Sequence, residues 1–161
     1  MIPGDDPIAI YLNDHLAGST VGLQVARRAA AENRDNDFGE FLSQLADEIE
    51  TDRRELERVM DSLGVGRDRL KRLAAWTGEK LGRLKLNGRL IRYAPLSRLV
   101  ELEMLSLGVE GKLSLWRTLQ TVADGDPRLR DVDLDELVSR ARSQRRRLET
   151  RRLRAAELAL R

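Results

Sequence analysis

The sequence predicts an all-α protein, an elongated four-helix bundle in which a shorter helix and a loop are inserted between the second and third long helices. Apolar residues recur at the period of an amphipathic helix in four long segments. Residues typical of helix starts and stops separate these segments. No stretch of five or more residues alternates convincingly between apolar and polar side chains. The chain has 161 residues, of which 41% are apolar and 35% charged, so we expect one helical domain over 1–161.

The first long helix is predicted over 7–33. Asp6 is a suitable N-cap, and Pro7 suits the first helical position because the backbone donor it lacks has no partner there. The middle of the apolar stripe holds small residues, among them Gly18 and Gly22. A second helix can therefore approach this one closely.

The second long helix is predicted over 37–63. Asp37 and Glu40 form a capping-box pattern, and Gly64 is a natural C-terminal stop. Only a few residues separate this helix from the first, so we expect the two to form an antiparallel hairpin.

An insert is predicted over 67–94. Residues 67–84 place several leucines on one face and are expected to form the shorter helix. The dipeptide Asn87-Gly88 then signals a turn, and a small β-hairpin around this turn is the alternative.

The third and fourth long helices are predicted over 95–122 and 133–160. Pro95 begins the third, and a second capping-box pattern, Asp133 to Glu136, begins the fourth. The third helix is apolar on more than one face, which predicts either that two of its sides are covered or that it bends near Gly108 and Gly111.

Polar residues interrupt the centre of each predicted apolar stripe. These residues are His15, Asp52, Glu103 and Arg145, with Gln144 beside the last. Because each lies near the middle of its helix, all could meet at one level of the bundle. An unpaired buried charge costs several kcal/mol, at the order of magnitude known for such groups. We therefore interpret them as a structural network in which His15 and Arg145 satisfy Asp52 and Glu103.

Two alternatives to this network stay open. The first is a metal or substrate site formed by His15, Asp52 and Glu103, with Glu48 nearby. The second is that some of these side chains face solvent at an edge of the bundle. The third long helix has more than one apolar face, so its sequence does not determine which glutamate points inward. The candidates are Glu101, Glu103 and Glu110.

Two segments resemble the ferritin-like superfamily. Residues 38–52 look like a ferritin-like second helix, which carries Glu-x-x-His; Ile49 stands at the Glu position and Asp52 at the His position. The run from Glu103 to Gly108 is similar to third-helix patterns of stress-response ferritin-like proteins, in which the Glu is a ligand. The stretch over 107–112 is also similar to one in uncharacterised actinobacterial proteins.

The resemblance implies a ferritin-like bundle with a degenerate di-iron site. Di-iron carboxylate chemistry needs about four carboxylates and two His on facing helices. The chain has a single His, and its last helix has no Glu-x-x-His. We therefore expect no cofactor, with iron as the alternative, and a cation, Arg145, in the space that a metal would use.

Composition excludes several classes of function. The chain has no Cys and one His, which excludes disulfide frameworks, thiolate metal sites and multi-His zinc sites within one chain. The residues form no pattern that is typical of a particular enzymatic reaction. We expect a non-catalytic bundle that acts through protein association. The alternatives are a metal-binding or di-iron stress-response protein with a reduced site, and nucleic-acid binding through the basic segment 67–98.

Charge and hydropathy indicate the setting and the partners. Residues 1–63 carry 6 basic and 14 acidic residues, and residues 64–98 carry 10 and 2, so net charges of −8 and +8 adjoin. This favours attraction within the fold or between two copies, and we expect a homodimer. The longest uncharged run, residues 16–26, is too short to span a bilayer, and no signal-peptide pattern is present at the N-terminus. We expect a cytoplasmic protein that does not bind membranes.

Overall fold

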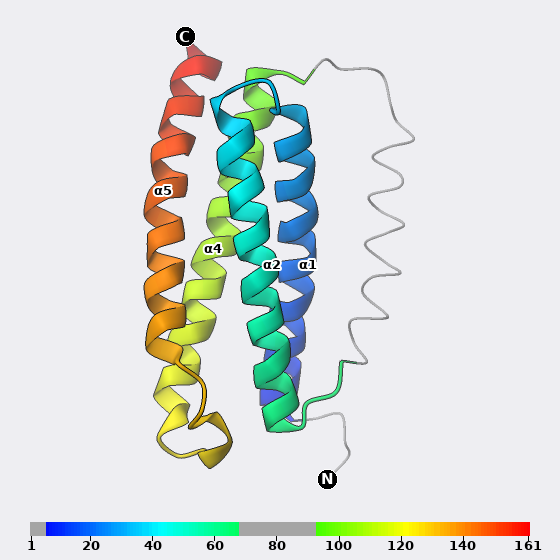
Figure 1. The fold of residues 1–161 in the computed structure, drawn as a ribbon, viewed down its shortest axis with the longest axis vertical. Helices are drawn as coiled ribbons and strands as arrows, with labels where there is room; N and C mark the ends of the chain where they lie inside the picture. Colours follow the sequence, from blue (N-terminus) through cyan, green and yellow to red (C-terminus); the bar gives the residue numbers. More distant parts are fainter. Residues whose placement is uncertain (1–5, 68–92) are drawn as a thin grey trace.

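A computed structural model describes residues 6–67 and 93–161, and within these ranges the prediction of an all-helical bundle is confirmed (Figure 1). Every regular element in the described ranges is a helix, and a short 3₁₀ turn precedes the last one. The elements are α1 (Pro7–Glu32), α2 (Asp37–Leu63), α4 (Pro95–Ala123), η1 (Pro127–Leu129) and α5 (Leu134–Leu160).

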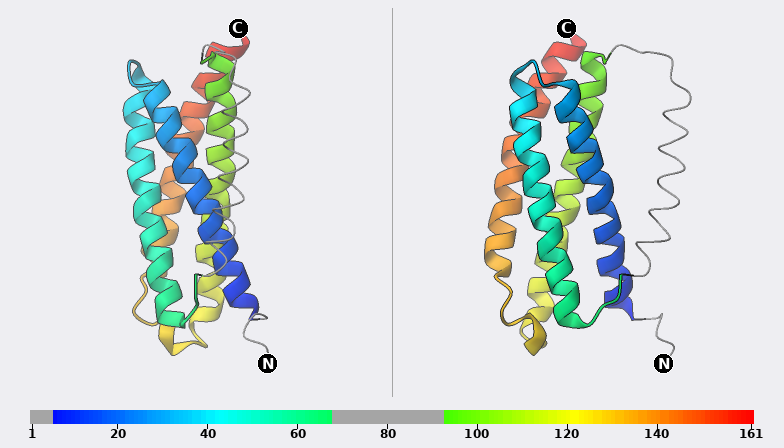
Figure 2. Two further views of the ribbon diagram at one scale, coloured as in Figure 1. Left: turned by 90° about the vertical axis from the view of Figure 1, so that its right-hand side faces the viewer. Right: turned by 45° about the vertical axis from the view of Figure 1, so that its right-hand side comes forward.

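The four long helices are ordered as two antiparallel hairpins. α1 packs against α2, α4 packs against α5, and α1 also packs against α4. α2 ends at the opposite end of the bundle from the start of α4, so these two helices run in the same direction (Figures 1 and 2). The chain therefore runs up, down, down and up, which is the order of a bundle with one long connection.

The helix ends follow the predicted caps with one correction. Asp6 accepts a hydrogen bond from the backbone N–H of Ile8 at 3.1 Å, and Asp133 accepts one from Glu136 at 2.9 Å. The capping box predicted at Asp37 is wrong by one residue. Asn36 is extended and caps α2 instead, accepting a hydrogen bond from the N–H of Phe38.

The C-terminus of α2 is closed in two ways. Gly64 has a φ of 68°, the left-handed conformation that glycine adopts without strain. In addition, Arg128 of η1 donates a hydrogen bond from Nη1 to the carbonyl of Leu63 at 3.0 Å. The loop before α5 is thereby joined to the end of α2.

Two apolar clusters form the core, one toward each end of the bundle. The first contains Leu12, Leu16, Leu56, Met60, Leu113, Trp116 and Val138, among others. The second contains Leu23, Phe38, Phe41, Leu45, Ile49, Leu105, Val109 and Leu148, among others. Along three helices the change from one cluster to the other occurs at a polar residue, namely Asp52, Lys112 or Gln144.

The two apolar faces of α4 have different surroundings. The inward face, which includes Leu105, Val109 and Trp116, is buried within the described chain. The outer face keeps large apolar side chains exposed, as described below. Trp116 is therefore a core residue, and it is not available for contact with another copy.

The predicted insert lies almost wholly outside the described residues. This applies to the helix expected over 67–84, to the turn at Asn87-Gly88 and to most of the basic segment 67–98. Among the helices that the structure describes, none has a stretch long and apolar enough to cross a bilayer.

Candidate functional site

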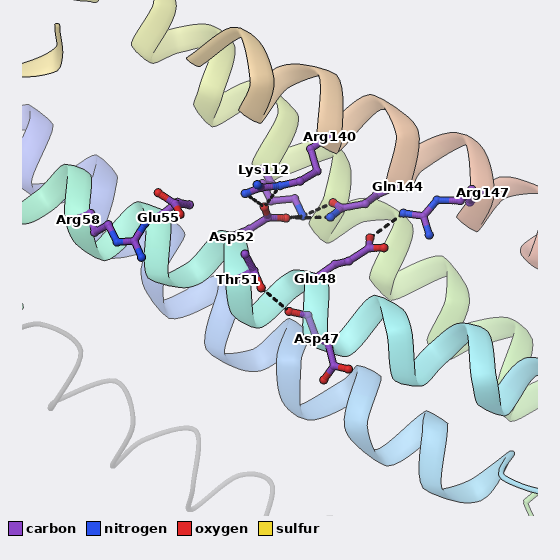
Figure 3. Close-up of polar contacts among 10 residues, drawn as sticks. All are labelled: Asp47, Glu48, Thr51, Asp52, Glu55, Arg58, Lys112, Arg140, Gln144 and Arg147. Carbon is purple, nitrogen blue, oxygen red and sulfur yellow. Dashed lines mark hydrogen bonds and ion pairs between the residues drawn. The ribbon is translucent and has the colours of Figure 1, made fainter. Parts of the chain in front are cut away.

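A buried carboxylate, Asp52 of α2, lies at the centre of a polar layer between the two apolar clusters (Figure 3). Its side chain is only 4% exposed. Lys112 reaches it from α4, and Arg140 and Gln144 reach it from α5. One carboxylate therefore joins three helices.

Both oxygens of Asp52 are fully engaged. Oδ1 accepts hydrogen bonds from Nε, at 2.7 Å, and Nη2 of Arg140. Oδ2 accepts from Nε2 of Gln144 at 3.0 Å and from Nζ of Lys112. Gln144 also accepts from Lys112 through Oε1. Its amide thus uses an acceptor and a donor, as a buried amide must if it is to stay satisfied.

The layer has more positive than negative charge. Asp52 supplies one carboxylate, whereas Lys112 and Arg140 supply two cations. Burial lowers the pKa of the Lys112 ammonium, the charges of Asp52 and Glu48 oppose that effect, and the charge of Arg140 adds to the lowering. One positive charge in this layer is therefore not balanced by the carboxylate that binds it.

The structure brings together some of the residues predicted for the polar cluster. Asp52 and Gln144 are directly hydrogen-bonded. Glu48 lies one turn before Asp52 and accepts a hydrogen bond from Arg147 of α5 at 2.7 Å, so it extends the layer (Figure 3).

His15 is half-buried, and together with Asp52 it lines a cavity between α1, α2 and α4 that is described below. Its ring meets that of Tyr11 edge-on, with centroids 4.6 Å apart. Burial lowers the pKa of His15, and the nearby Asp14 partly opposes this. Burial therefore favours the neutral form of His15, which lines the cavity and does not act as a cationic partner of Asp52.

Glu103 and Arg145 are not part of the layer. Glu103 is exposed, 3.7 Å from Arg152, and Arg145 is bonded at 2.8 Å to Glu110 on the outside of the bundle. Glu101 is the inward-facing glutamate of α4. The prediction that Arg145 binds Asp52 is therefore wrong. Lys112 and Arg140 bind this carboxylate instead.

Sequence reasoning missed Lys112 and Arg140. A signal for Lys112 was present, since it lies three residues after Val109 and four before Trp116, on the buried face of α4. Arg140 is next to Ala141 of the core. Long basic side chains look like surface residues because their stems cover apolar area while their ends stay polar.

A second polar network joins the top of α1 to the start of α4. Glu101 accepts hydrogen bonds from Nε of Arg28 at 3.0 Å and from the hydroxyl of Tyr93 at 2.6 Å. The same hydroxyl accepts from Nδ2 of Asn33 at 2.9 Å. Burial and the bond to Glu101 raise the pKa of Tyr93 far above its ordinary value of 10. Arg98 stacks on the ring of Phe38 and donates to Asn33.

The alternative metal set is not brought together. Glu103 faces outward, and the oxygens of Asp52 already accept hydrogen bonds from two cations and an amide. Within the described ranges, no three His, Asp or Glu side chains are grouped closely enough to hold a metal ion. The residues around Asp52 therefore do not fit a di-iron centre.

A cavity of about 450 Å³ lies between α1, α2 and α4, beside the polar layer. Its wall is mostly apolar, with Ile49, Leu56 and Leu105 among the lining residues. The ionisable residues of the lining include Asp14, His15, Asp52, Arg53 and Lys112. The volume is within the range of small-molecule sites, roughly 300–1,000 Å³.

Comparison with known proteins gives no relative for this chain. No family model matches it, and no curated protein or solved structure matches it significantly.

Proposed function

We propose that this protein is a non-catalytic, ferritin-like helical bundle that acts by association, and that the outer face of α4 binds a second copy of the chain. The observation that carries the proposal is a stripe of exposed large apolar residues on α4. We call Leu96, Val100, Met104 and Leu107 the α4 stripe. Their exposed fractions are 53%, 47%, 49% and 76%.

The α4 stripe is a continuous surface. At 100° per residue, its four members fall within an arc of about 80° on the helix. At 1.5 Å per residue, they extend over about 16 Å along its axis. Single exposed apolar residues are ordinary, but several in one patch mark an interaction surface.

A second copy fits this stripe because the stripe is symmetric about its own centre. If a copy of α4 crosses antiparallel near residue 102, Leu96 of one chain faces Leu107 of the other. Val100 then faces Met104 in the same register. An interface formed by one patch with itself is the arrangement of a two-fold dimer.

The ferritin-like assignment rests on two further features. The helices run in the order of a bundle with one long connection, which is one of the orders found in ferritin-like folds. The resemblance of residues 38–52 to a ferritin-like second helix places Asp52 at a ligand position. In this chain the carboxylate of Asp52 binds Lys112 and Arg140 instead of a metal ion. This supports a bundle without the iron chemistry of the family.

Sedimentation velocity over a range of concentrations tests the association. We expect a dimer in the wild-type protein, and little effect of salt because the surface is apolar. Leu107→Glu is expected to shift the protein to monomer. Leu158→Glu is the matched control, since Leu158 is a similarly exposed leucine on α5. A wild-type monomer up to about 100 μM, a weak limit on the usual scale of affinities, would refute the proposal.

A further inference from the structure

We propose that the cavity between α1, α2 and α4 binds a small organic anion, a monocarboxylate with an apolar tail. The tail would lie along the apolar wall, and the carboxylate would lie against Lys112, Arg53 and Trp116. This site is separate from the α4 stripe and does not depend on association.

The cavity has room for such a tail. Gly18 and Gly22 of α1 face it from one side, and Gly108 and Gly111 of α4 from the other. A Cβ added at any of the four meets no atom within 4 Å, so the glycines leave space there. The cavity volume of about 450 Å³ lies within the range of small-molecule sites, roughly 300–1,000 Å³. That suits an apolar tail with its carboxylate.

Two side chains that line the cavity, Trp116 and Arg53, each carry a buried donor without a partner in the described part of the chain. Trp116 is 1% exposed, and its Nε1 has no hydrogen-bond partner among the described residues. The same holds for the buried Nε of Arg53. Lys112 uses two of its three N–H groups on Asp52 and Gln144. Buried donors are rarely left unpaired, so a ligand for this cavity must bring acceptor atoms.

The excess positive charge beside the cavity favours an anion over a neutral ligand with acceptor atoms. Asp52 faces both Lys112 and Arg140, which leaves one positive charge unbalanced beside the cavity. Glu48 is bonded to Arg147, and Glu57 to Arg53 at 3.0 Å, so neither carboxylate removes this excess. Asp14 also lines the cavity, but it is exposed to solvent, whereas the Lys112 side chain is only 15% exposed. A carboxylate carries one negative charge and two acceptor oxygens, which matches the excess and the donors. A neutral alcohol would satisfy a donor but leave the charge unbalanced.

The indole N–H resonances of the full chain give a direct test. The sequence has two tryptophans, Trp76 and Trp116, so a ¹⁵N-labelled protein shows two indole signals. A Trp76→Phe variant assigns them. Decanoate, kept below its micelle concentration, is expected to move the Trp116 signal in a saturable way at one molecule per chain. Decylamine, which has the same tail and the opposite charge, is expected to leave that signal in place.

Matched variants test the location of the site. Gly22→Leu fills the cavity and is expected to weaken decanoate binding at least tenfold. Gln24→Leu, at an exposed position of the same helix, is expected to leave binding unchanged. Lys112→Met is expected to weaken binding at least tenfold, with circular dichroism to show that the helices are retained.

Three results would overturn the proposal. They are no movement of the Trp116 signal with decanoate, an equal response to decylamine, and equal binding by Gly22→Leu and Gln24→Leu. None of these results would affect the association proposal, which is tested separately by sedimentation and by disulfide trapping.

Discussion

Lys112 of α4 donates a hydrogen bond to Asp52 of α2 in the interior of the bundle, and the two residues belong to different helical hairpins. Arg140 of α5 binds the other oxygen of the same carboxylate. The layer around Asp52 thus joins the α1–α2 hairpin to the α4–α5 hairpin between the two apolar clusters. We infer that these directed bonds help to specify one register of the two hairpins, because apolar packing is less directional.

Replacing Asp52 is expected to be strongly destabilising. Asp52→Asn keeps the shape of the side chain but leaves Lys112 and Arg140 without a carboxylate in a buried layer. Breaking a buried ion pair in this way costs about 3–5 kcal/mol. Urea unfolding followed by circular dichroism measures this loss.

The control for Asp52 is an exposed pair. Glu110→Gln removes the ion pair with Arg145 on the surface, and such pairs contribute about 0–1 kcal/mol. Equal losses for the two variants would show that the Asp52 layer is no more important than a surface ion pair.

The free energy of unfolding should depend on pH through His15. Burial lowers the pKa of His15 below the value of 6.5 that it has when unfolded, so the unfolded chain binds more protons below pH 6.5. Stability is therefore fully present above pH 6.5 and falls as the pH drops toward the lowered pKa of the folded state.

The comparison variant for this pH dependence is His15→Gln. His15 is the sole histidine of the chain, so the variant is expected to lose less stability than the wild type between pH 8 and pH 5. Urea midpoints at several pH values give the difference. A wild type that gains stability relative to His15→Gln on acidification would contradict the buried, neutral histidine.

Removing the hydroxyl of Tyr93 is expected to cost about 1–3 kcal/mol, the penalty of leaving a buried partner unsatisfied. Tyr93→Phe deletes the donor to Glu101 and the acceptor for Asn33 while keeping the ring. Thermal unfolding at pH 7 measures the change. A loss below about 0.5 kcal/mol, the level of a surface substitution, would show that water replaces the hydroxyl.

Truncating core leucines is expected to cost about 2–5 kcal/mol each. Leu45 and Leu56 are both buried, in different clusters, so Leu45→Ala and Leu56→Ala test the two ends of the bundle separately. Leu158→Ala, at an exposed position, is the control. If one core variant behaved like Leu158→Ala, the cluster at that end would not be packed as described.

Much of the fold could be predicted because the helix ends carry specific capping residues. Asp6, Gly64 and Asp133 act through local bonds, which sequence alone can indicate. The start of α2 shows the limit of this reasoning. Asn36 and Asp37 are both good N-caps, and only the backbone conformation selects Asn36.

The site was less predictable, since its composition depends on how α4 rotates in the bundle. α4 is apolar on two faces, so its sequence does not say whether Glu101 or Glu103 points inward. Asp52 could be identified because it interrupts a clean stripe on α2. Its partner Lys112 gave a weaker signal through its spacing from Val109 and Trp116, because a long basic side chain at such a position is equally common on a surface.

Disulfide trapping tests the association through α4 most directly, because the chain has no native Cys. Chains with Val100→Cys are mixed with chains with Met104→Cys and oxidised. The antiparallel register places these two positions opposite each other, so the account predicts that the mixed dimer forms faster than either variant forms dimers alone. Cross-linking no faster than that of an exposed control position, such as Ser139→Cys on α5, would contradict it.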